Sequence, residues 1–231
     1  CPIVATGLSA ASIRFWKRLP NWQFCQGPKE FSLRFKQHYS IEKPFNNGIE
    51  LREFRSIEEL TEILSFQEFL DKFHRPMVHG MIRTTCYLKW RYDSHPYHRY
   101  HYFAFFRAGT MVGLLVTRAS VEDYLGKALC PKILWIVEFI VLPEFASEMP
   151  ILLSEWYKII SDQDVELIKI WTSDPAMTHS LIESGYKAAQ GFAEPWVIDV
   201  PESFLASSSI SPSVLQTLDQ WCLSRGDCDF D

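Results

Sequence analysis

The chain has 231 residues, of which 47% are hydrophobic and 15% aromatic, and its formal net charge is −5. A chain this apolar can fill a substantial core, which excludes global disorder. The negative charge argues against a nucleic-acid partner, because phosphate binding needs a clustered basic surface. The longest apolar run, Ile133–Phe145, is short and contains two glutamates, so the sequence predicts no membrane span.

The six cysteines are scattered, without a CxxC pair. This pattern is typical of reduced thiols and favours neither a disulfide framework nor a zinc site. With no signal-peptide pattern visible, we expect a cytoplasmic protein. The first residue is Cys1 rather than methionine, and we expect the chain to be a fragment of a longer protein.

Three elements are predicted in the first forty residues. Ser9–Leu19 has the pattern of a helix, because Ser9 is a suitable N-cap and apolar side chains recur at three-residue spacing. The apolar segments Trp22–Gln26 and Glu30–Phe35 predict two strands.

One strand and two helices are predicted next. Ile49–Phe54 alternates as a half-buried strand does. Ser56 and Glu59 form a capping-box pattern, which predicts a helix over Ile57–Phe73. A second helix is expected over Met77–Tyr92.

The centre of the chain predicts a mixed α/β sheet. Tyr100–Arg107 and Met111–Arg118 predict a hairpin that turns at Ala108–Gly109. Ile133–Leu142 is almost continuously apolar, as expected of a central strand buried on both faces. With the next helix and strand it forms a βαβ unit, whose two strands should be parallel. The elements expected after it are helix Ile151–Ile160, strand Val165–Trp171, helix Pro175–Ser184, strand Trp196–Val200 and helix Val214–Leu223.

A partial internal repeat links the two ends of the chain. Trp22–Glu30 aligns with Tyr186–Glu194, and the two segments share a Gln-Gly pair and a final glutamate. In both places a helix is predicted just before and an apolar strand just after. The match is either chance or a sign that residues 1–40 are the tail of a preceding copy of the same domain. We therefore divide the chain into this remnant at 1–40, a domain at 41–202, and a tail with a short helix at 203–231.

Two motifs resemble those of the GNAT superfamily of N-acyltransferases. Val141-Leu-Pro-Glu-Phe145 is similar to the stretch that ends the family's central strand and enters its acetyl-CoA loop. Glu183-Ser-Gly-Tyr186 is similar to the family's helix end before a glycine–aromatic pair. The resemblance implies an α/β (α+β) fold with a GNAT-like mixed central sheet flanked by helices. It also implies acetyl-CoA, or another acyl-CoA, as cofactor.

Three shorter stretches resemble one subgroup of the family. These are Leu88–Tyr92, His95–Tyr97 and the ending Gly226–Asp231. The subgroup comprises bacterial tandem-GNAT proteins associated with polysaccharide biosynthesis. This resemblance implies a partner GNAT domain in the same polypeptide, or a homodimer.

The expected phosphate loop departs from the family pattern. Family glycines let backbone N–H groups approach the pyrophosphate at a helix N-terminus. In this chain Met149 stands at a glycine position, Pro150 removes an N–H donor, and Glu148 adds a negative charge. The changes predict weak coenzyme A binding, and the other interpretation is a β–α turn without a ligand. The positions that the resemblance assigns to the cofactor are Ile140, Leu142, Ala146, Ser147 and Met149.

Glu138 lies mid-strand, where the family often places its catalytic carboxylate. Apolar neighbours would raise the pKa of this carboxyl toward the range of a general base. The alternative is a structural carboxylate paired with a buried Arg or His. The family's tyrosine acid has no counterpart, because its position holds Leu181.

Trp90, Arg91 and Tyr92 are the candidate substrate-binding residues. Arg91 could clamp a carboxylate or phosphate of the acceptor, while the alternative is an aromatic core anchor with Arg91 in a salt bridge. No metal site is expected, because the three-residue spacing of His95, His98 and His101 places successive histidines on opposite faces of a strand.

Two functions follow from these observations. The first is a GNAT-like N-acyltransferase that moves an acyl group from acyl-CoA to a small amine or amino sugar, with weakened cofactor binding. The second is a degenerate, non-catalytic GNAT domain that supports a catalytic partner domain.

Overall fold

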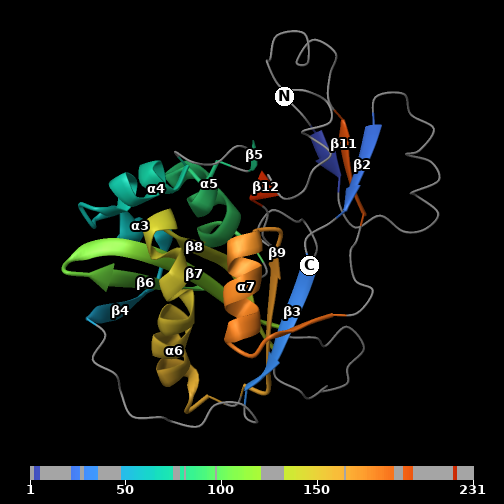
Figure 1. The fold of residues 1–231 in the computed structure, drawn as a ribbon. Helices are drawn as coiled ribbons and strands as arrows, with labels where there is room; N and C mark the ends of the chain where they lie inside the picture. Colours follow the sequence, from blue (N-terminus) through green and yellow to red (C-terminus); the bar gives the residue numbers. More distant parts are fainter. Residues whose placement is uncertain are drawn as a thin grey trace.

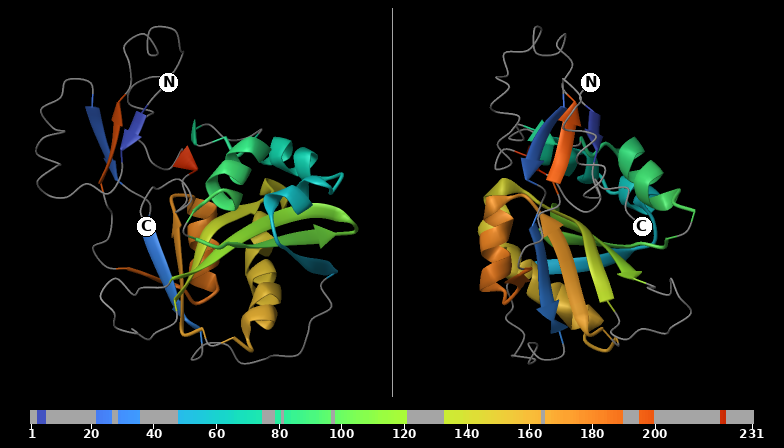
Figure 2. Two further views of the ribbon diagram at one scale, coloured as in Figure 1. Left: turned by 180° about the vertical axis from the view of Figure 1, so that it is seen from behind. Right: turned by 90° about the vertical axis from the view of Figure 1, so that its right-hand side faces the viewer.

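The structure is a computed structural model. It describes residues 3–5, 22–26, 29–35, 48–74, 79–80, 82–96, 98–120, 133–163, 165–189, 195–199 and 221–222. A mixed sheet with helices on both faces forms the main body, and a smaller sheet lies beside it (Figures 1 and 2).

The main sheet has seven strands, and β8 is the fourth of them. The strands lie in the order β10 (Lys187–Ala188), β3 (Lys29–Arg34), β9 (Leu167–Thr172), β8 (Ile133–Val141), β7 (Thr110–Ser120), β6 (His101–Arg107) and β4 (Ile49–Phe54). β8 pairs antiparallel with β7 and parallel with β9. The predicted central strand and its parallel neighbour are thereby confirmed, as is the mixed α/β fold class.

The predicted hairpin between β6 and β7 is also confirmed. Its two turn residues, Ala108 and Gly109, have φ angles of 48° and 78°. Positive φ at both positions is typical of the two-residue turns that match the twist of antiparallel strands.

Helices cover the two faces of the main sheet and divide its core into two clusters. On one face lie α3 (Ile57–Thr61), α4 (Phe66–His74), α5 (Thr85–Leu88) and the π-helical turn η1 (Lys89–Asp93). On the other face lie α6 (Met149–Ile160) and α7 (Pro175–Glu183). β8 contributes side chains to both clusters, which explains its nearly continuous apolar sequence.

The single helix predicted over Ile57–Phe73 is wrong, because the chain breaks between α3 and α4. Ile57 and Phe66 are both buried. In one continuous helix these two positions would lie about half a turn apart, on opposite faces. The break lets both helices turn their apolar faces to the sheet, and it leaves Leu64 fully exposed.

The helix predicted over Met77–Tyr92 is wrong in its first part. His79–Gly80 is a strand, β5, and the helix begins only at Thr85, where the Thr84 hydroxyl caps it by accepting from the Tyr87 amide. β5 pairs in parallel with β12 (Trp221–Cys222). The end of the predicted helix Val214–Leu223 is therefore a strand, because its backbone pairs with a partner remote in sequence.

The two ends of the domain exchange strands. β3 comes from the first forty residues, yet it lies between β9 and β10 in the main sheet. β11 (Pro195–Asp199) comes from the C-terminal part of the chain, yet it lies between β1 (Ile3–Ala5) and β2 (Trp22–Gln26) in the smaller sheet. Strand pairing thus crosses the expected boundary near residue 40 in both directions. The predicted helix Ser9–Leu19 lies outside the described residues.

Candidate functional site

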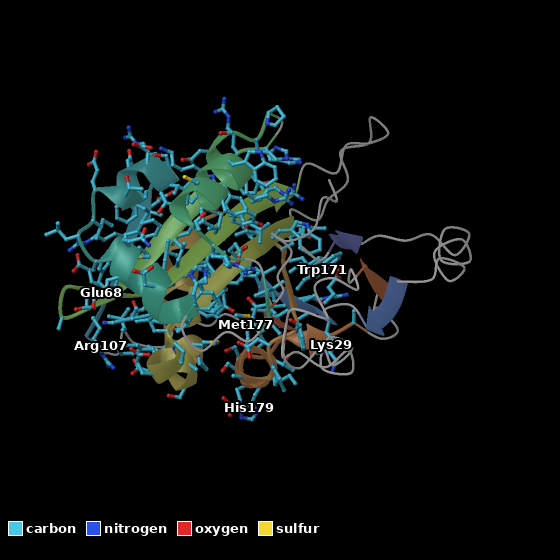
Figure 3. The ribbon with its side chains drawn as sticks, turned by 90° about the horizontal axis from the view of Figure 1, so that it is seen from above. Lys29, Glu68, Arg107, Trp171, Met177 and His179 are labelled. Carbon is cyan, nitrogen blue, oxygen red and sulfur yellow. The ribbon has the colours of Figure 1, made fainter. Side chains whose placement is uncertain are left out.

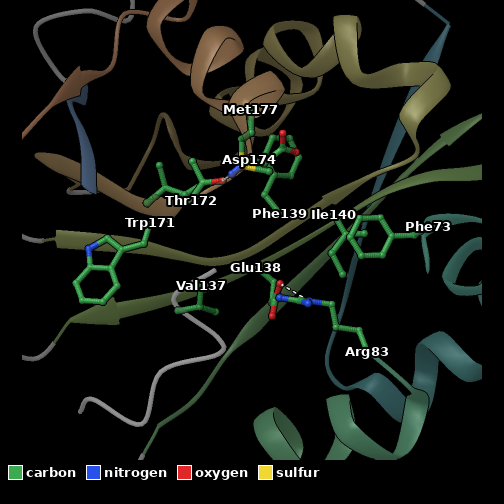
Figure 4. A pocket seen from close by; sticks show the side chains of 11 residues that line it. Phe73, Arg83, Val137, Glu138, Phe139, Ile140, Trp171, Thr172, Asp174 and Met177 are labelled. Carbon is green, nitrogen blue, oxygen red and sulfur yellow. Dashed lines mark hydrogen bonds and ion pairs between the residues drawn. The ribbon is translucent and has the colours of Figure 1, made fainter. Parts of the chain in front are cut away.

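A hollow opens where β8 and β9 part. The parallel pairing runs only from Ile133 opposite Leu167 to Ile136 opposite Ile170. Beyond that point β8 remains paired with β7, and β9 remains paired with β3. The hollow holds about 330 Å³ of empty space, including solvent at its mouth. It is lined by Phe73, Arg83, Val137, Glu138, Phe139, Ile140, Ile170, Trp171, Thr172, Asp174 and Met177 (Figure 4).

A β-bulge directs Glu138 into this hollow. Val116 of β7 lies opposite Glu138, whereas its neighbour Thr117 lies opposite Ile136, so Val137 is the extra residue. Ile136 and Phe139 pack on the α6 side of the sheet, while Val137 and Ile140 pack on the α3–α5 side. Strict alternation would place Glu138 on the α6 side with Ile136. The bulge instead brings it to the α3–α5 side, and re-aiming a side chain in this way is a common use of bulges.

Glu138 is held by two buried partners. Its side chain is 2% exposed, and Oε2 accepts from Arg83 Nε at 3.1 Å. Oε1 accepts from the Tyr92 hydroxyl at 2.9 Å. The apolar surroundings expected from the sequence are therefore only part of the environment, because a guanidinium and a phenol also contact the carboxylate. Figure 4 shows the side chains of Arg83 and Glu138 in contact, joined by a dashed line.

Arg83 is a residue of the candidate site that the sequence analysis did not identify. Its side chain is only 1% exposed, and its partner lies 55 residues further along the chain. No local pattern marks such a residue, because its role depends on a contact that only folding creates. The sequence predicted only, as one alternative, that Glu138 would pair with a buried Arg or His, and it did not identify which residue this would be.

His74 positions the backbone beside Arg83. The Arg83 amide donates to His74 Nε2 at 2.8 Å. Partial burial, and then the nearby Arg83 charge, lower the pKa of His74 below its ordinary value, while Asp71 opposes the shift. The neutral ring is the form that can accept this hydrogen bond.

The three candidate substrate residues divide between the core and the surface. Tyr92 is buried and contacts Glu138. Trp90 is 64% exposed, and its ring lies 6.0 Å from that of Tyr87. Arg91 is half-buried. The structure therefore joins Tyr92, but not Trp90, to the hollow.

Backbone amides of the candidate cofactor loop are already hydrogen-bonded within the protein. Residues Pro143–Glu148 form a 3-10 helix, η2, that runs directly into α6. The Leu142 amide donates to Val112 O at 3.0 Å, and the Met149 amide donates to Ala146 O. Met149 is buried and Ser147 exposed, while Ile140 lines the hollow.

An ion pair lies at the start of α6. Glu148 Oε1 accepts from Arg107 Nη1 at 2.5 Å, and the two side chains are 21% and 40% exposed. A carboxylate at a helix N-terminus is stabilised by the helix dipole. Glu148 is the N-cap residue of α6, and its carboxylate pairs with Arg107 rather than with the amides of the first helical turn. Figure 3 shows Arg107 well apart from Trp171 and Met177.

The other candidate groups are structural. Leu181 is fully buried, and the Tyr186 hydroxyl accepts from Tyr157 at 2.9 Å. Burial raises the pKa of Tyr186 far above its ordinary value, so it remains protonated. The rings of His95 and His98 stack at 4.6 Å, which corrects the expectation of opposite faces. Within the described ranges, no three His, Cys, Asp or Glu side chains group as a metal site.

Solved structures with a similar fold include an N-acetyltransferase and a probable N-acyltransferase, although no family model and no curated protein matches the sequence. A GCN5-related N-acetyltransferase from Anabaena variabilis is 11% identical with a TM-score of 0.53, and the match covers 85% of this chain and 45% of that one. A probable N-acyltransferase from Enterococcus faecalis is 12% identical with a TM-score of 0.56, and the match covers 85% of this chain and 44% of that one. The myristoyl-CoA complex of Saccharomyces cerevisiae N-myristoyltransferase is 9% identical with a TM-score of 0.51, and the match covers 76% of this chain and 47% of that one.

These likenesses establish a GNAT-like fold. The chain spans less than half the length of each of these three proteins. In the part of the chain that the structure describes, no helix is long and apolar enough to cross a membrane.

Replacing Arg83 by Met should destabilise the protein by about 3–5 kcal/mol, because it leaves the buried Glu138 carboxylate without its counter-charge. Chemical denaturation monitored by tryptophan fluorescence measures the change. The double variant Arg83→Met/Glu138→Gln should recover much of the loss. Arg52→Met is the matched control, because it removes an exposed ion pair with Glu50 and should leave the denaturation midpoint nearly unchanged.

His74 should make the stability depend on pH. Because its pKa is lower in the folded than in the unfolded protein, the unfolded chain binds more protons below about pH 6.5, and the free energy of unfolding should decrease there as the pH falls. His74→Gln should flatten this part of the profile, whereas a change at the exposed His179 should not. An unaltered slope in His74→Gln would show that the histidine does not contribute.

Proposed function

We propose that this chain is a GNAT-like N-acyltransferase domain that transfers an acyl group from acyl-CoA to a small amine, with weakened cofactor binding. The observation that carries the proposal is the carboxylate of Glu138, held at the wall of the hollow between β8 and β9. An acyl thioester seated between the parted strands would lie beside this carboxylate. We further propose an amino sugar as acceptor, in the polysaccharide biosynthesis of the cytoplasm.

The residues of the hollow have distinct roles in this proposal. Glu138 would take the proton of the attacking amine. Arg83 and Tyr92 are positioning residues, because they hold the two carboxylate oxygens in fixed directions. Trp90 and Arg91 would contact the part of the acceptor that lies outside the hollow. Ile140 and the η2 segment, with Leu142, Ala146, Ser147 and Met149, would contact the cofactor.

A non-catalytic role is the second candidate, and the start of α6 favours it. Glu148 occupies the positive end of the helix and is neutralised by Arg107. The amides of Leu142 and Met149 already donate to protein carbonyls, and Pro150 has no N–H. A pyrophosphate would therefore meet a negative charge and few available donors. In this case the domain supports a catalytic partner.

The affinity for acetyl-CoA measures how strongly Glu148 and the missing N–H donors weaken cofactor binding. We expect the wild-type chain to bind acetyl-CoA at best in the millimolar range by calorimetric titration. Glu148→Gln should strengthen binding about 3–10-fold, because it removes a like charge at the phosphate position and frees the helix end. Glu144→Gln is the matched control, since Glu144 is exposed on the same 3-10 helix. Micromolar binding by the wild type would contradict the weakened-loop interpretation.

Glu138→Gln tests the proposed chemistry. With acetyl-CoA and a panel of amino sugars, thiol release should fall about 10²–10⁴-fold in kcat, while the KM for acetyl-CoA changes little. Circular dichroism must show that the variant is folded. Equal turnover in wild type and Glu138→Gln would exclude the carboxylate as base, and the absence of turnover in the wild type would favour the non-catalytic role.

A further inference from the structure

Five side chains form a continuous row across the main sheet, one from each of five neighbouring strands. In the backbone register each is opposite the next, in the order Lys187 of β10, Ser32 of β3, Lys169 of β9, Trp135 of β8 and Arg118 of β7. Residues directly opposite each other share a face of the sheet. Because Trp135 packs in the core cluster of the α3–α5 side, the whole row lies on that side. We call these five residues the basic row.

Positive charge is concentrated at the basic row. Three of its five members are cations, and Arg34 lies on the same face, two residues along β3 from Ser32. On this face Glu30 is the one carboxylate among the described residues of β10, β3 and β9. Lys187 and Arg34 are exposed. The chain as a whole has a net charge of −5, so this face is oppositely charged to the rest of the protein and attracts anions.

Two cations of the basic row are held in place. Lys169 Nζ lies 3.1 Å from Glu30 Oε1 and 4.9 Å from the centre of the Trp135 ring. The other Glu30 oxygen accepts from Trp171 Nε1 at 2.9 Å. Arg118 is only 5% exposed, and a charge in such surroundings acts more strongly on an anion than it would in water. Cations that are fixed before a ligand arrives lose less entropy when it binds.

The basic row lies beside the hollow between β8 and β9. Trp171 lines the hollow (Figure 4), and it lies two residues along β9 from Lys169. This spacing corresponds to about 7 Å along a strand. The rings of Trp171 and Trp135 meet edge to edge-on at 6.2 Å, and Glu30 contacts both Trp171 and Lys169. The row and the hollow therefore share one wall.

We propose that the basic row binds the phosphate or carboxylate group of a small amine, whose remaining part extends past Trp171 toward Glu138. Trp135 and Glu138 are three residues apart on β8, or about 10 Å along a strand, a distance comparable with the length of a phosphorylated amino sugar. The inference rests on the proposed function where it identifies this ligand as the acyl acceptor. It adds that the acceptor carries a negative charge.

Titration with three amino sugars tests the anionic group. Glucosamine 6-phosphate carries a phosphate, muramic acid carries a carboxylate, and glucosamine carries neither. Followed by NMR of the indole N–H groups of Trp135 and Trp171, at least one of the two anionic sugars should bind the wild-type chain about tenfold more tightly than glucosamine, and added salt should weaken this binding. The tighter anionic sugar identifies the group. Equal binding of all three sugars, or no binding of any, would overturn the inference.

Substitutions in and beside the basic row test its position. Lys169→Gln should weaken binding of the tighter anionic sugar at least tenfold, because it removes the central charge-assisted contact. Arg34→Gln/Lys187→Gln should weaken it about 3–10-fold, since exposed ion pairs are weaker. These two residues are exposed, so the double variant decides the question even if Lys169→Gln fails to fold.

The matched control is Arg52→Gln/Lys72→Gln. It removes the same charge from two exposed ion pairs, with Glu50 and Glu68, and should change the affinity by no more than about twofold. Equal losses in the two double variants would overturn the inference by assigning the effect to net charge.

The result is separable from that of the proposed function. If the wild-type chain shows no acyl transfer but Arg34→Gln/Lys187→Gln binds the anionic sugar less tightly, the anion site stands and the catalytic role fails. If Glu138→Gln abolishes turnover while Arg34→Gln/Lys187→Gln leaves the KM for that sugar unchanged, the catalytic role stands and the basic row is rejected.

Discussion

β8 and β9 share only four residue pairs before they part, and the candidate site depends on this short pairing. Beyond the gap, β8 is paired with β7 and β9 is paired with β3. β3 comes from the first forty residues of the chain. The walls of the hollow are therefore held in the sheet by strands that lie far apart in the sequence.

The bulge at Val137 turns this opening into a place where chemistry could occur. It shifts one glutamate from the α6 side of the sheet to the α3–α5 side, where Arg83 and Tyr92 lie. A carboxylate buried without such partners would be costly. These two contacts satisfy both carboxylate oxygens of Glu138, which lies in the lining of the hollow.

The carboxylate of Glu138 and the start of α6 have different surroundings. Glu138 is buried and accepts from Arg83 and Tyr92, whereas Glu148, the N-cap residue of α6, forms an ion pair with Arg107. A carboxylate and a phosphate are both favoured at the N-terminus of a helix, because both are anions. In the function we propose, Glu148 would therefore oppose the binding of a phosphate at this helix end.

The sequence by itself determined the longer strands of the main sheet and the parallel pairing of β8 with β9, because alternation and apolar runs are local properties that a strand displays along its own length. It also determined the position of Glu138 and the changes in the loop. The tertiary structure alone decided the break between α3 and α4, since two apolar faces half a turn apart must reach the same sheet. It alone decided the Arg83–Glu138 pair and the exchange of β3 and β11. Those contacts join residues far apart in the chain, and no local pattern encodes which distant backbone or charge will complete them.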